Sequence, residues 1–502
     1  MLIAVVPVNS CKSTKNQIDK IDENVDGIEL RLDYLNPLDF SSIAALRFAC
    51  KRPVIFTLRK TSQGGFYQKN EEIRLQEISR LCKYHPDYFD IEYDVPTTFV
   101  KEMMSRYPTI KWIRSFHDFD HTPSDLDKLF DSLKETGFYS YKIATKANTI
   151  LDTFRMLEFV KSRHTTHKIT GLCMGEKGQI TRILSPIIGN AMNYTVLDAT
   201  QLTAPGQLTL NQLLTTYHYK KLNLQTKLYA LLGDPVHMSV GHILHNQAIE
   251  YLQENAVYIK IPVTANELPF ILEKCKNLSF FGFSITMPLK EAVIPSLDKI
   301  ENPSIKAINS IIKYQDAFIG FNTDGIGAIQ ALMSYTDITQ KTFIILGAGG
   351  AAKAIAYEAL RHKAHVIILN RTLGKAKILS TEIGCESNEL KTLPHLKTAN
   401  SIIINTLPNH VYSEYPALEW INFNSPSHFI AMDIVYQPIE TTFLKLAKQA
   451  NAVYIFGYEM YIHQALLQIK QWFKPTDQQL HDIKNKMKQF FQHQLNNINR
   501  AC

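Results

Sequence analysis

Residues Lys341–Ala352 read KTFIILGAGGAA and indicate the architecture of the second half of the chain. The apolar run at the start is typical of a buried strand, and it passes directly into a glycine-rich turn. A helix is expected next, over Lys353–His362. A G-x-G-x-x-A turn between a strand and a helix is typical of dinucleotide-binding domains, because the glycines leave room for the pyrophosphate and the helix N–H groups bind it. The residues expected at the cofactor are Gly347, Gly349, Gly350 and Ala351.

The next strand is expected over His365–Leu369, and the residues after it indicate which dinucleotide binds. Asn370 lies 23 residues after Gly347 (370 − 347 = 23), where NAD enzymes place an acid that binds the ribose 2′-hydroxyl. This chain has Arg371 beside that position, and a guanidinium suits a 2′-phosphate. The sequence therefore predicts NADP; the alternative is that Arg371 merely caps the strand end. The residues assigned to this part of the site are Asn370, Arg371, Thr372 and Lys375.

Toward the N-terminus, eight short runs rich in Val, Ile, Tyr and Thr recur within about 215 residues. They are Ile3–Val8, Gly27–Leu35, Pro53–Arg59, Tyr88–Asp94, Ile110–His117, Tyr139–Thr145, Lys168–Met174 and Tyr194–Thr200. The clearest helix between them follows Ser124, the expected N-cap, and has apolar residues at helical spacing from Leu126 to Leu133. Eight strand–helix units in this length predict a (β/α)8 barrel.

In such a barrel, the chemistry gathers at the carboxyl ends of the strands. The polar residues expected there are Glu29, Arg31, Arg59, Asp90, His117, Lys142 and Arg182. Strand alternation puts Lys142 on the face of Ser140 and Ala144, whose small side chains leave room for the amine. Burial and nearby cations would then favour a neutral amine, which can attack a ketone. Taken singly, each residue is more often an ordinary surface or ion-pairing residue, for example Arg31 or Arg59 paired with Glu29, so the prediction depends on their common location.

The composition is that of an ordinary globular protein. Lys and Arg number 54 against 47 Asp and Glu, a net charge of +7, and charged residues make up 20% of the 502 residues. No Lys/Arg run suggests a nucleic-acid tail, so small anionic substrates are the favoured partners. No uncharged apolar run reaches the roughly 18 residues of a membrane span. About three domains are expected.

The seven cysteines are scattered, and no C-x-x-C pair occurs. This pattern indicates neither a disulfide framework nor a Cys-rich zinc site, and no metal is expected. Because the chain also opens without a secretory or transit pattern, a cytoplasmic location is expected.

Several motifs of the first half resemble type I 3-dehydroquinate dehydratase. They are Gly27–Asp33, Phe56–Arg59, Phe116–Phe119, the strand that holds Lys142, and Ala204–Gln207, and they occur in order over nearly the whole segment. The resemblance implies that Lys142 forms a Schiff base with the substrate ketone, that His117 is the general base and then the general acid, and that Arg182 binds the substrate carboxylate bidentately. It also implies a pocket lined by Glu29, Arg31, Arg59, Met174, Thr203 and Gln207.

Two positions depart from the pattern of that family. Gln63 stands where the family usually has Glu, and Thr203 stands where it usually has Ser. Both keep hydrogen-bonding capacity, so tuning of the site rather than its loss is expected.

Motifs within residues 228–475 resemble shikimate dehydrogenase. They are Phe283–Glu291, Ala307–Ser310, Gly320–Gly325, Asp433–Tyr436 and Gly457–Met460. The resemblance implies that Lys290 and Asp324 are the catalytic pair, since an ammonium held by a carboxylate can protonate the alkoxide that hydride transfer leaves. It further implies substrate contacts by Ser239, Thr286, Asn309 and Gln464, and cofactor contacts by Asn405, Thr406 and Gly457.

The first loop of this half departs from its family more strongly. The family typically has two serines there that bind the substrate carboxylate; Ser239 fills the first position and Gly241 replaces the second. A lost hydroxyl bond to a charged oxygen is worth roughly 1.5–3 kcal/mol, so weaker substrate binding is expected. Compensation by His242, Tyr461 or a water stays open.

Together these patterns predict an α/β protein with four parts. They are a (β/α)8 barrel over 1–217, a linker over 218–227, a shikimate-binding α/β domain over 228–325 completed by C-terminal helices at about 458–500, and a Rossmann NADP domain over 326–457. The last helix is expected over Asp477–Gln494, and the oligomeric state stays open.

The expected activity is the dehydration of 3-dehydroquinate to 3-dehydroshikimate, followed by NADPH-dependent reduction to shikimate. One alternative is that the second half is a quinate dehydrogenase using NAD, and another is that it is a catalytically idle binding module. A third makes the barrel an aldolase-type lyase acting on a sugar phosphate, but Arg182 and Gln207 suit a carboxylate better.

Overall fold

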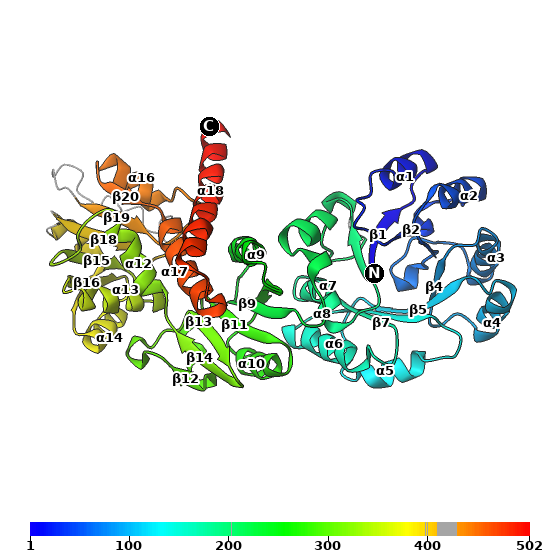
Figure 1. Cartoon of the computed structure of the whole chain (residues 1–502), viewed down its shortest axis with the longest axis horizontal. Coiled ribbons are helices and arrows are strands. Elements are labelled where there is room, and N and C mark those ends of the chain that lie inside the picture. Colours follow the sequence, from blue (N-terminus) through cyan, green and yellow to red (C-terminus); the bar gives the residue numbers. More distant parts are fainter. Residues whose placement is uncertain (202, 397, 399, 409–428, 502) are drawn as a thin grey trace. The chain divides into compact units, whose positions relative to one another are not determined.

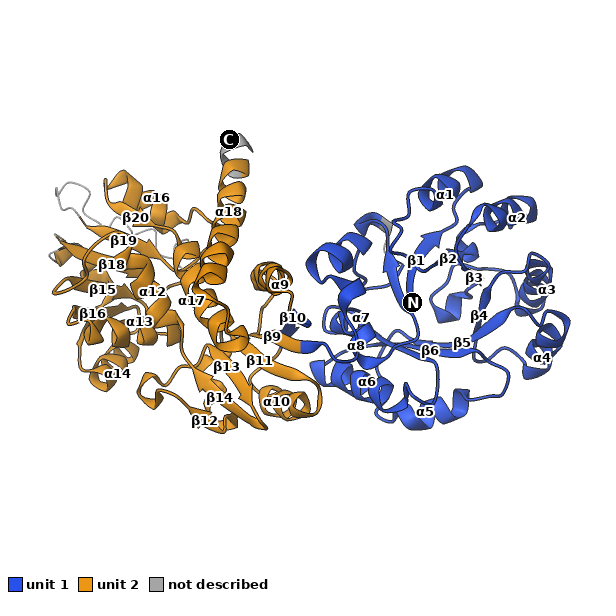
Figure 2. Cartoon of the chain, in the orientation of Figure 1, with its two compact units in different colours: residues 1–227, 255–262 blue, residues 228–254, 263–502 orange. Residues whose placement is uncertain are grey.

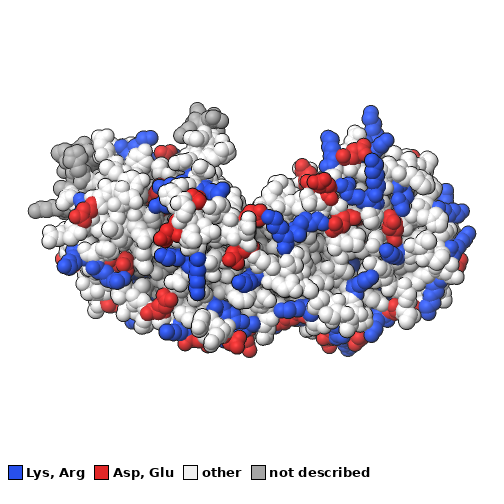
Figure 3. Space-filling view, viewed as in Figure 1, with Lys and Arg blue, Asp and Glu red and all other residues white. Residues whose placement is uncertain are grey.

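The computed structural model describes residues 1–201, 203–396, 398, 400–408 and 429–501. The chain divides into two compact units, residues 1–227 with 255–262, and residues 228–254 with 263–502 (Figure 2). Both contain strands and helices in the alternation that was predicted (Figure 1). On the face shown in Figure 3, positive and negative side chains are interspersed.

The first unit is built on eight parallel strands. They are β1 (Leu2–Pro7), β2 (Gly27–Arg31), β3 (Val54–Thr57), β4 (Tyr88–Glu92), β5 (Lys111–Asp118), β6 (Ser140–Lys146), β7 (Ile169–Met174) and β8 (Asn193–Val196). Each strand pairs with the next from β1 to β7, and β8 pairs with β1. Just before β8, the Ala191 N–H donates to the Ile169 carbonyl oxygen of β7 at 2.8 Å. The prediction of a (β/α)8 barrel with these eight strands is therefore confirmed.

Helices lie around the outside of this barrel (Figure 1). They are α1 (Cys11–Ile18), α2 (Phe40–Ala49), α3 (Glu71–Cys82), α4 (Thr97–Arg106), α5 (Leu126–Leu133), α6 (Ile150–Arg163), α7 (Ile180–Ile183) and α8 (Ser185–Ile188). The prediction of Ser124 as the N-cap of α5 is wrong. Asp125 is the cap, and its side chain accepts a hydrogen bond from the Lys128 N–H at 2.8 Å. A carboxylate is a good cap because it also interacts favourably with the positive end of the helix dipole.

Two predicted strands end four residues earlier than expected. β2 ends at Arg31 rather than Leu35, because the chain turns into a 3-10 helix over Leu32–Tyr34. β8 ends at Val196 rather than Thr200, and a 3-10 helix follows over Ala199–Gln201. Both differences occur at carboxyl ends, where apolar sequence continues into the loops that surround the site.

An apolar cluster fills the interior of the barrel. Its buried members are Ile3, Val5, Ile55, Tyr88, Ile113, Ala144, Leu172, Met192 and Tyr194. Four of them, Val5, Ala144, Leu172 and Tyr194, also line the cavity described below. The core of the barrel is therefore also a wall of its site.

The second unit contains two six-stranded sheets. The first has the order β10-β9-β11-β13-β14-β12, with β9 and β11 parallel and β11, β13 and β14 antiparallel. Its strands are β9 (Lys227–Gly233), β10 (Ala256–Pro262), β11 (Phe280–Ile285), β12 (Lys299–Ile300), β13 (Ser310–Tyr314) and β14 (Ala317–Phe321). Its helices are α9 (Gly241–Leu252), α10 (Leu268–Asn277) and α11 (Leu289–Ala292).

The second sheet is parallel throughout, in the order β17-β16-β15-β18-β19-β20. Its strands are β15 (Thr342–Leu346), β16 (His365–Asn370), β17 (Glu386–Glu389), β18 (Ser401–Asn405), β19 (Ile430–Asp433) and β20 (Val453–Ile455). Numbered from β15, this is the 3-2-1-4-5-6 order of a Rossmann fold, as predicted. Its crevice lies where the order reverses, between β15 and β18.

The remaining helices are α12 (Asp324–Met333), α13 (Gly350–Arg361), α14 (Leu373–Ile383), α16 (Thr442–Gln449), α17 (Gly457–Phe473) and α18 (Asp477–Ala501). α13 begins three residues before the predicted Lys353, because Gly349 is its N-cap and the glycine turn supplies its first residues. α18 extends past the predicted end at Gln494. Residues of α9, α17 and α18 share one apolar core, which includes Leu244, Ile462 and Phe491.

Residues 218–227, predicted to be a polar linker, include a 3-10 helix over Tyr219–Lys221 in which Tyr219 is buried. One buried tyrosine in a basic run leaves no periodic signal in the sequence. Within the described residues, no helix is both long and apolar enough to span a membrane, and no cluster of side chains suits a metal ion. No disulfide joins the six described cysteines; Cys502 lies outside the described residues.

Candidate active sites

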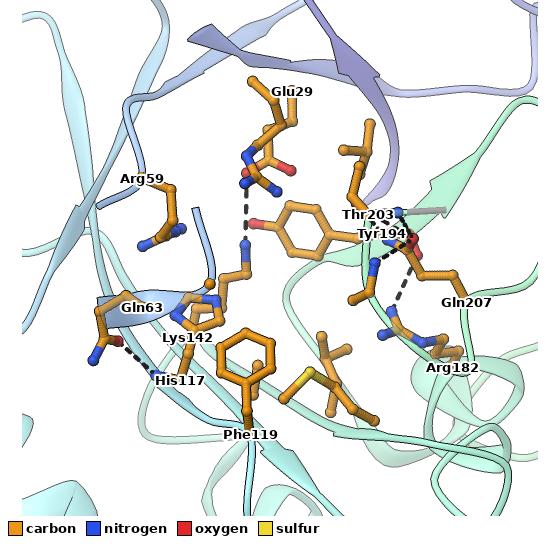
Figure 4. A pocket seen from close by; sticks show the side chains of 17 residues that line it. Glu29, Arg59, Gln63, His117, Phe119, Lys142, Arg182, Tyr194, Thr203 and Gln207 are labelled. Carbon is orange, nitrogen blue, oxygen red and sulfur yellow. Dashed lines mark hydrogen bonds and ion pairs between the residues drawn. The ribbon is translucent and has the colours of Figure 1, made fainter. Parts of the chain in front are cut away.

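Lys142 lies in β6 with its side chain inside the barrel (Figure 4). Its Nζ is 3.1 Å from Asp90 Oδ2 and 3.6 Å from Glu29 Oε1. Arg59 is a nearby cation, since it shares Asp90 with this amine, but the direct ionic contacts of the amine are with acidic side chains from β2 and β4. These carboxylates stabilise positive charge on the nitrogen, whether it is an ammonium or a cationic product of addition to a ketone.

Arg59 follows β3 and forms ion pairs with acidic side chains beside the site. Its guanidinium is 2.8 Å from Asp90 and 3.8 Å from Glu92, and it donates to the Ser115 hydroxyl at 2.6 Å. Burial disfavours the Asp90 carboxylate, but the charges of Arg59 and Lys142 outweigh this effect and keep the Asp90 pKa below its ordinary value. Asp90 thus joins Arg59 to the amine.

Glu29 and Arg31 both reach the cavity from β2, but they do not pair with each other. Arg31 forms two hydrogen bonds with the Asp33 carboxylate, at 2.9 and 2.8 Å. Glu29 accepts a hydrogen bond from the Thr57 hydroxyl at 2.8 Å. Glu29 therefore remains in contact with Lys142.

His117 lies in β5, near its end, and is suited to act as a base. Burial lowers its pKa well below the ordinary value, and the positive charges of Arg59 and Lys142 lower it further. The imidazole is consequently neutral near pH 7. The His117 main-chain N–H donates to Gln63 Oε1 at 3.0 Å. Gln63, which replaces the usual Glu, therefore supplies an oxygen acceptor.

Arg182 is a buried cation that no described carboxylate neutralises. It is 2% exposed, and its Nη1 donates to the main-chain oxygen of Tyr194 at 3.3 Å, while its Nε has no hydrogen-bond partner among the described residues. Burial lowers its pKa to about 10, so it remains charged. A buried charge of this kind favours an anionic ligand.

Gln207 organises the loop that faces Arg182. Its Oε1 accepts hydrogen bonds from the Thr203 N–H at 2.8 Å and the Ala204 N–H at 3.1 Å. Its Nε2 donates to the Thr203 hydroxyl at 3.0 Å. The threonine hydroxyl thus fills the place of the usual serine in this loop.

One cavity brings together all nine residues that the sequence predicted for this half. They are Glu29, Arg31, Arg59, His117, Lys142, Met174, Arg182, Thr203 and Gln207. Asp90, which was also expected at the strand ends, contacts Lys142 at 3.1 Å. Sequence reasoning did not assign Phe119 or Tyr194 to the site, although both line it. The inward alternation along β8 is a signal that could have indicated Tyr194.

In the second unit, Lys290 and Asp324 form a close ion pair. Lys290 Nζ lies 2.5 Å from Asp324 Oδ2, with Lys290 in α11 and Asp324 at the first residue of α12. A carboxylate at the start of a helix is stabilised by the helix dipole. The other carboxylate oxygen accepts a hydrogen bond from Asn309 Nδ2 at 2.7 Å. The pair is therefore held from both sides.

Asn309 also links the pair to α17, since its Nδ2 lies 3.4 Å from Gln464 Oε1. Thr286 and Ser239 lie in the segments that follow β11 and β9. The Thr286 N–H donates to the Leu232 carbonyl oxygen at 2.9 Å, which joins these two loops. Ser239 Oγ accepts a hydrogen bond from the Gly241 N–H at 3.1 Å. Among the described contacts, neither side chain hydrogen-bonds to Lys290 or Asp324.

The glycine turn between β15 and α13 is shaped as a cradle. Gly347 has φ +115°, and a Cβ there would lie 2.4 Å from the Thr406 hydroxyl, so only glycine fits. A Cβ on Gly349 would meet nothing within 4 Å, which leaves room above the helix N–H groups. A Cβ on Gly350 would lie 3.4 Å from carbons of Lys290, so the turn abuts the ion pair.

Four predicted cofactor residues lie at the end of β16 and just after it. Asn370, the last residue of the strand, is buried, and the other three are exposed. Asn370 Nδ2 donates to the Thr372 carbonyl oxygen at 3.0 Å, which shapes the turn. Arg371 and Lys375 are exposed, as a contact with a 2′-phosphate requires. The residues therefore fit NADP at this edge.

Asn405 and Thr406 shape the neighbouring turn after β18. Asn405 is fully buried, and its Nδ2 donates to Asp433 Oδ1 at 2.9 Å. Burial raises the pKa of Asp433 to about 6. Thr406 Oγ1 donates to the Leu346 carbonyl oxygen at 2.8 Å. A Cβ on Gly457 would lie 2.3 Å from the Val435 carbonyl oxygen, so glycine allows α17 to begin against the segment after β19.

Three family models match the chain in the order of its parts. Residues 2–223 match Type I 3-dehydroquinase, residues 231–311 match the Shikimate dehydrogenase substrate binding domain, and residues 330–446 match Shikimate / quinate 5-dehydrogenase.

Whole-length relatives combine the same parts. The chain is 35% identical over 497 residues to the Shikimate biosynthesis protein AroDE of Chlamydia pneumoniae, covering 98% of this chain and 99% of that protein. It is 32% identical to the Bifunctional 3-dehydroquinate dehydratase/shikimate dehydrogenase, chloroplastic, of Arabidopsis thaliana, covering 94% of this chain and 81% of that protein. The chain is also 35% identical over 263 residues to the Shikimate dehydrogenase (NADP(+)) of Carboxydothermus hydrogenoformans, covering 50% of this chain and 93% of that protein.

Proposed function

The chain belongs to the family of bifunctional 3-dehydroquinate dehydratase/shikimate dehydrogenases, and we propose which of its residues carry the two reactions. The barrel dehydrates 3-dehydroquinate to 3-dehydroshikimate, and the second unit reduces this product to shikimate with NADPH. The observation that best supports the residue assignment is the convergence in one cavity of a buried lysine, a neutral histidine and a guanidinium that no described carboxylate neutralises.

In the barrel, Lys142 supplies the nucleophile. A deprotonated amine attacks the ketone carbon, and loss of one water leaves a protonated Schiff base. Glu29, at 3.6 Å, accepts the proton that the ammonium must first release and returns it to the departing water. Asp90, at 3.1 Å, stays charged and balances the charge of the iminium. The iminium draws electrons and so acidifies the neighbouring CH2 group.

His117 then moves the proton. Its neutral imidazole takes a proton from that CH2 group, and the electron pair passes to the iminium to give an enamine. The resulting imidazolium gives the proton to the departing hydroxyl, which leaves as water. Hydrolysis of the Schiff base releases the unsaturated ketone and restores the Lys142 amine. Arg182 binds the substrate carboxylate and so fixes the ring relative to both groups.

In the second unit, Lys290 and Asp324 handle the proton of the reduction. NADPH, when bound, supplies the hydride to the ketone carbon. Lys290 donates a proton to the ketone oxygen, and Asp324, held by Asn309, keeps the ammonium oriented. Ser239, Thr286 and Gln464 bind the remainder of the substrate. Gly347, Gly349, Gly350 and Ala351 hold the pyrophosphate, and Arg371 and Lys375 hold the 2′-phosphate.

The assignment of Lys142 can be tested by reductive trapping. Sodium borohydride added to the full-length protein with 3-dehydroquinate should reduce the Schiff base and fix the carbon skeleton on the peptide that contains Lys142. Mass mapping after digestion checks this result. Dehydration should be lost in proportion to labelling, while shikimate oxidation by NADP in the same sample should persist. Normal dehydration without a label on Lys142 would refute the mechanism.

Three broader assignments belong to the same proposal. The domain boundaries are those expected from the sequence, with the barrel over 1–217 and the Rossmann domain over 326–457. The partners are small molecules, namely the two substrates and NADP, and not nucleic acid. The location is cytoplasmic, which agrees with the lack of disulfides among the six described cysteines.

A further inference from the structure

Tyr194, in β8, lies beside the amine of Lys142 in the barrel interior (Figure 4). Lys142 Nζ lies 3.9 Å from the ring centroid, and the tyrosine is 3% exposed. This separation is well within the range of about 6 Å over which a cation interacts with an aromatic face. The amine therefore has carboxylates on one side and a ring face on another.

Among the described contacts, the hydroxyl of Tyr194 does not hydrogen-bond to Lys142. Its nearest recorded partner is the Met192 sulfur, at 3.6 Å. Burial raises the Tyr194 pKa well above the ordinary value, and the negative charges of Glu29 and Asp90 raise it further, so the phenol stays neutral. Tyr194 therefore interacts with Lys142 through its ring and not through proton transfer by its hydroxyl.

The ring matters more after the Schiff base has formed than before. An ammonium has three N–H donors and can be shared between the carboxylates of Asp90 and Glu29. When the amine and the ketone combine with one proton and release one water, the nitrogen keeps its positive charge but only one N–H. It can then donate to one carboxylate, whereas attraction to a ring face needs no N–H.

We propose that the face of the Tyr194 ring stabilises the cationic nitrogen of the Schiff base on Lys142, which makes Tyr194 a catalytic residue of the barrel. This inference depends on the Schiff-base mechanism proposed above. Because the interaction is stronger in the intermediate than in the free site, its loss lowers kcat rather than raising KM. The main-chain oxygen of Tyr194 also accepts a hydrogen bond from Arg182, so the same strand position contacts both ends of the cavity.

The test compares Tyr194→Phe, which keeps the ring, with Tyr194→Leu, which removes it, in the full-length protein. Tyr194→Phe should keep the kcat of dehydration within about twofold of the parent, and Tyr194→Leu should lower it about tenfold. KM should change less than about twofold in either variant. The yield of borohydride-trapped Lys142 at saturating 3-dehydroquinate should fall with kcat in Tyr194→Leu.

Tyr88→Leu is the matched control. Tyr88 is buried in the same apolar cluster as Tyr194 but does not line the cavity, so its loss should lower stability comparably and leave the kcat of dehydration unchanged. Shikimate oxidation by the second unit reports the amount of folded protein. If Tyr194→Leu does not fold, fluorinated phenylalanines at position 194 replace it; kcat should fall stepwise as fluorine weakens the negative ring face.

The outcomes separate this inference from the mechanism beneath it. Normal trapping at Lys142 together with an unchanged kcat in Tyr194→Leu would overturn only the role of the ring and leave the Schiff base standing. A kcat that is insensitive to fluorination would do the same. Absence of trapping in the parent protein would overturn the Schiff base, and the role of Tyr194 with it.

Discussion

At the scale of single residues, the barrel site holds two buried arginines in opposite electrostatic situations. Arg59 lies 2.8 Å from Asp90 and 3.8 Å from Glu92, so its charge is neutralised by carboxylates of the protein. Arg182 has no carboxylate partner among the described residues. An unneutralised buried charge costs stability, and it persists where a ligand supplies the opposite charge.

Replacing Arg182 with Met should therefore weaken substrate binding without weakening the fold. We expect the KM for 3-dehydroquinate to rise about tenfold or more, since each charge-assisted hydrogen bond contributes about 1.5–3 kcal/mol. The Tm should stay level or rise, because a buried unpaired charge is removed. Steady-state kinetics and thermal unfolding check both. A sharp fall in Tm with an unchanged KM would show a structural role instead.

The pH dependence of dehydration should reflect the depressed pKa of His117. Burial, Arg59 and Lys142 hold that pKa well below its ordinary value, so the imidazole remains a free base as the pH falls from 7 to 6. A histidine with an ordinary pKa of about 6.5 would lose most of its free base over this range. We expect kcat/KM for dehydration to change little there, measured from product absorbance at each pH. A loss centred near pH 6.5 would contradict this assignment.

At the scale of elements, the turn between β15 and α13 uses two glycines for different reasons. Gly347 needs φ +115° and has no room for a Cβ beside Thr406. Gly349 has φ −95°, which any residue adopts, and open space around it. The first glycine allows the backbone to turn, and the second leaves space for the pyrophosphate.

Alanine substitutions should separate these two requirements. Gly347→Ala should destabilise the protein by about 1–3 kcal/mol and abolish NADPH binding, because the strained backbone cannot hold the turn. Gly349→Ala should leave the Tm unchanged and still weaken NADPH binding. Thermal unfolding and NADPH fluorescence titration measure the two effects. Equal losses of Tm in both variants would contradict the distinction.

At the scale of the whole molecule, each unit has an apolar core of its own. One fills the barrel, and others cover the Rossmann sheet and join α9, α17 and α18. Each proposed catalytic pair lies within one unit, Lys142 with His117 and Lys290 with Asp324. The two reactions should therefore fail independently.

Variants of the two lysines should complement each other. Lys142→Ala should abolish dehydration and leave shikimate oxidation within about twofold, and Lys290→Ala should do the reverse, because each catalytic pair lies within its own unit and the two pairs share no partner. An equimolar mixture should convert 3-dehydroquinate to shikimate with NADPH, followed by the loss of NADPH absorbance. Loss of both activities in either variant would show that the units depend on each other. The parent protein supplies the control rate.

Local pattern predicted most of the fold. All eight barrel strands were found, and so were the glycine turn and the Rossmann strand that precedes it, because alternation and helical spacing are properties of short segments. Errors lay at element ends, such as the N-cap at Asp125 rather than Ser124, where neighbouring residues compete for the same backbone N–H. The nine residues assigned to the barrel site also line one cavity, since motifs at strand ends converge in this fold.

The chemistry around Lys142 could not be read in the same way. Its position in a strand and its small neighbours follow from seven consecutive residues, and so does its inward face. Its contacts with Glu29, Asp90 and Tyr194 come from β2, β4 and β8, which are far apart in the chain and meet only when the barrel closes. Electrostatic interaction depends on distance in space and on burial, neither of which is a property of a short segment. For that reason the sequence sufficed to place the lysine and the two carboxylates at the strand ends, whereas only the folded barrel decided that both carboxylates and the Tyr194 ring contact the amine.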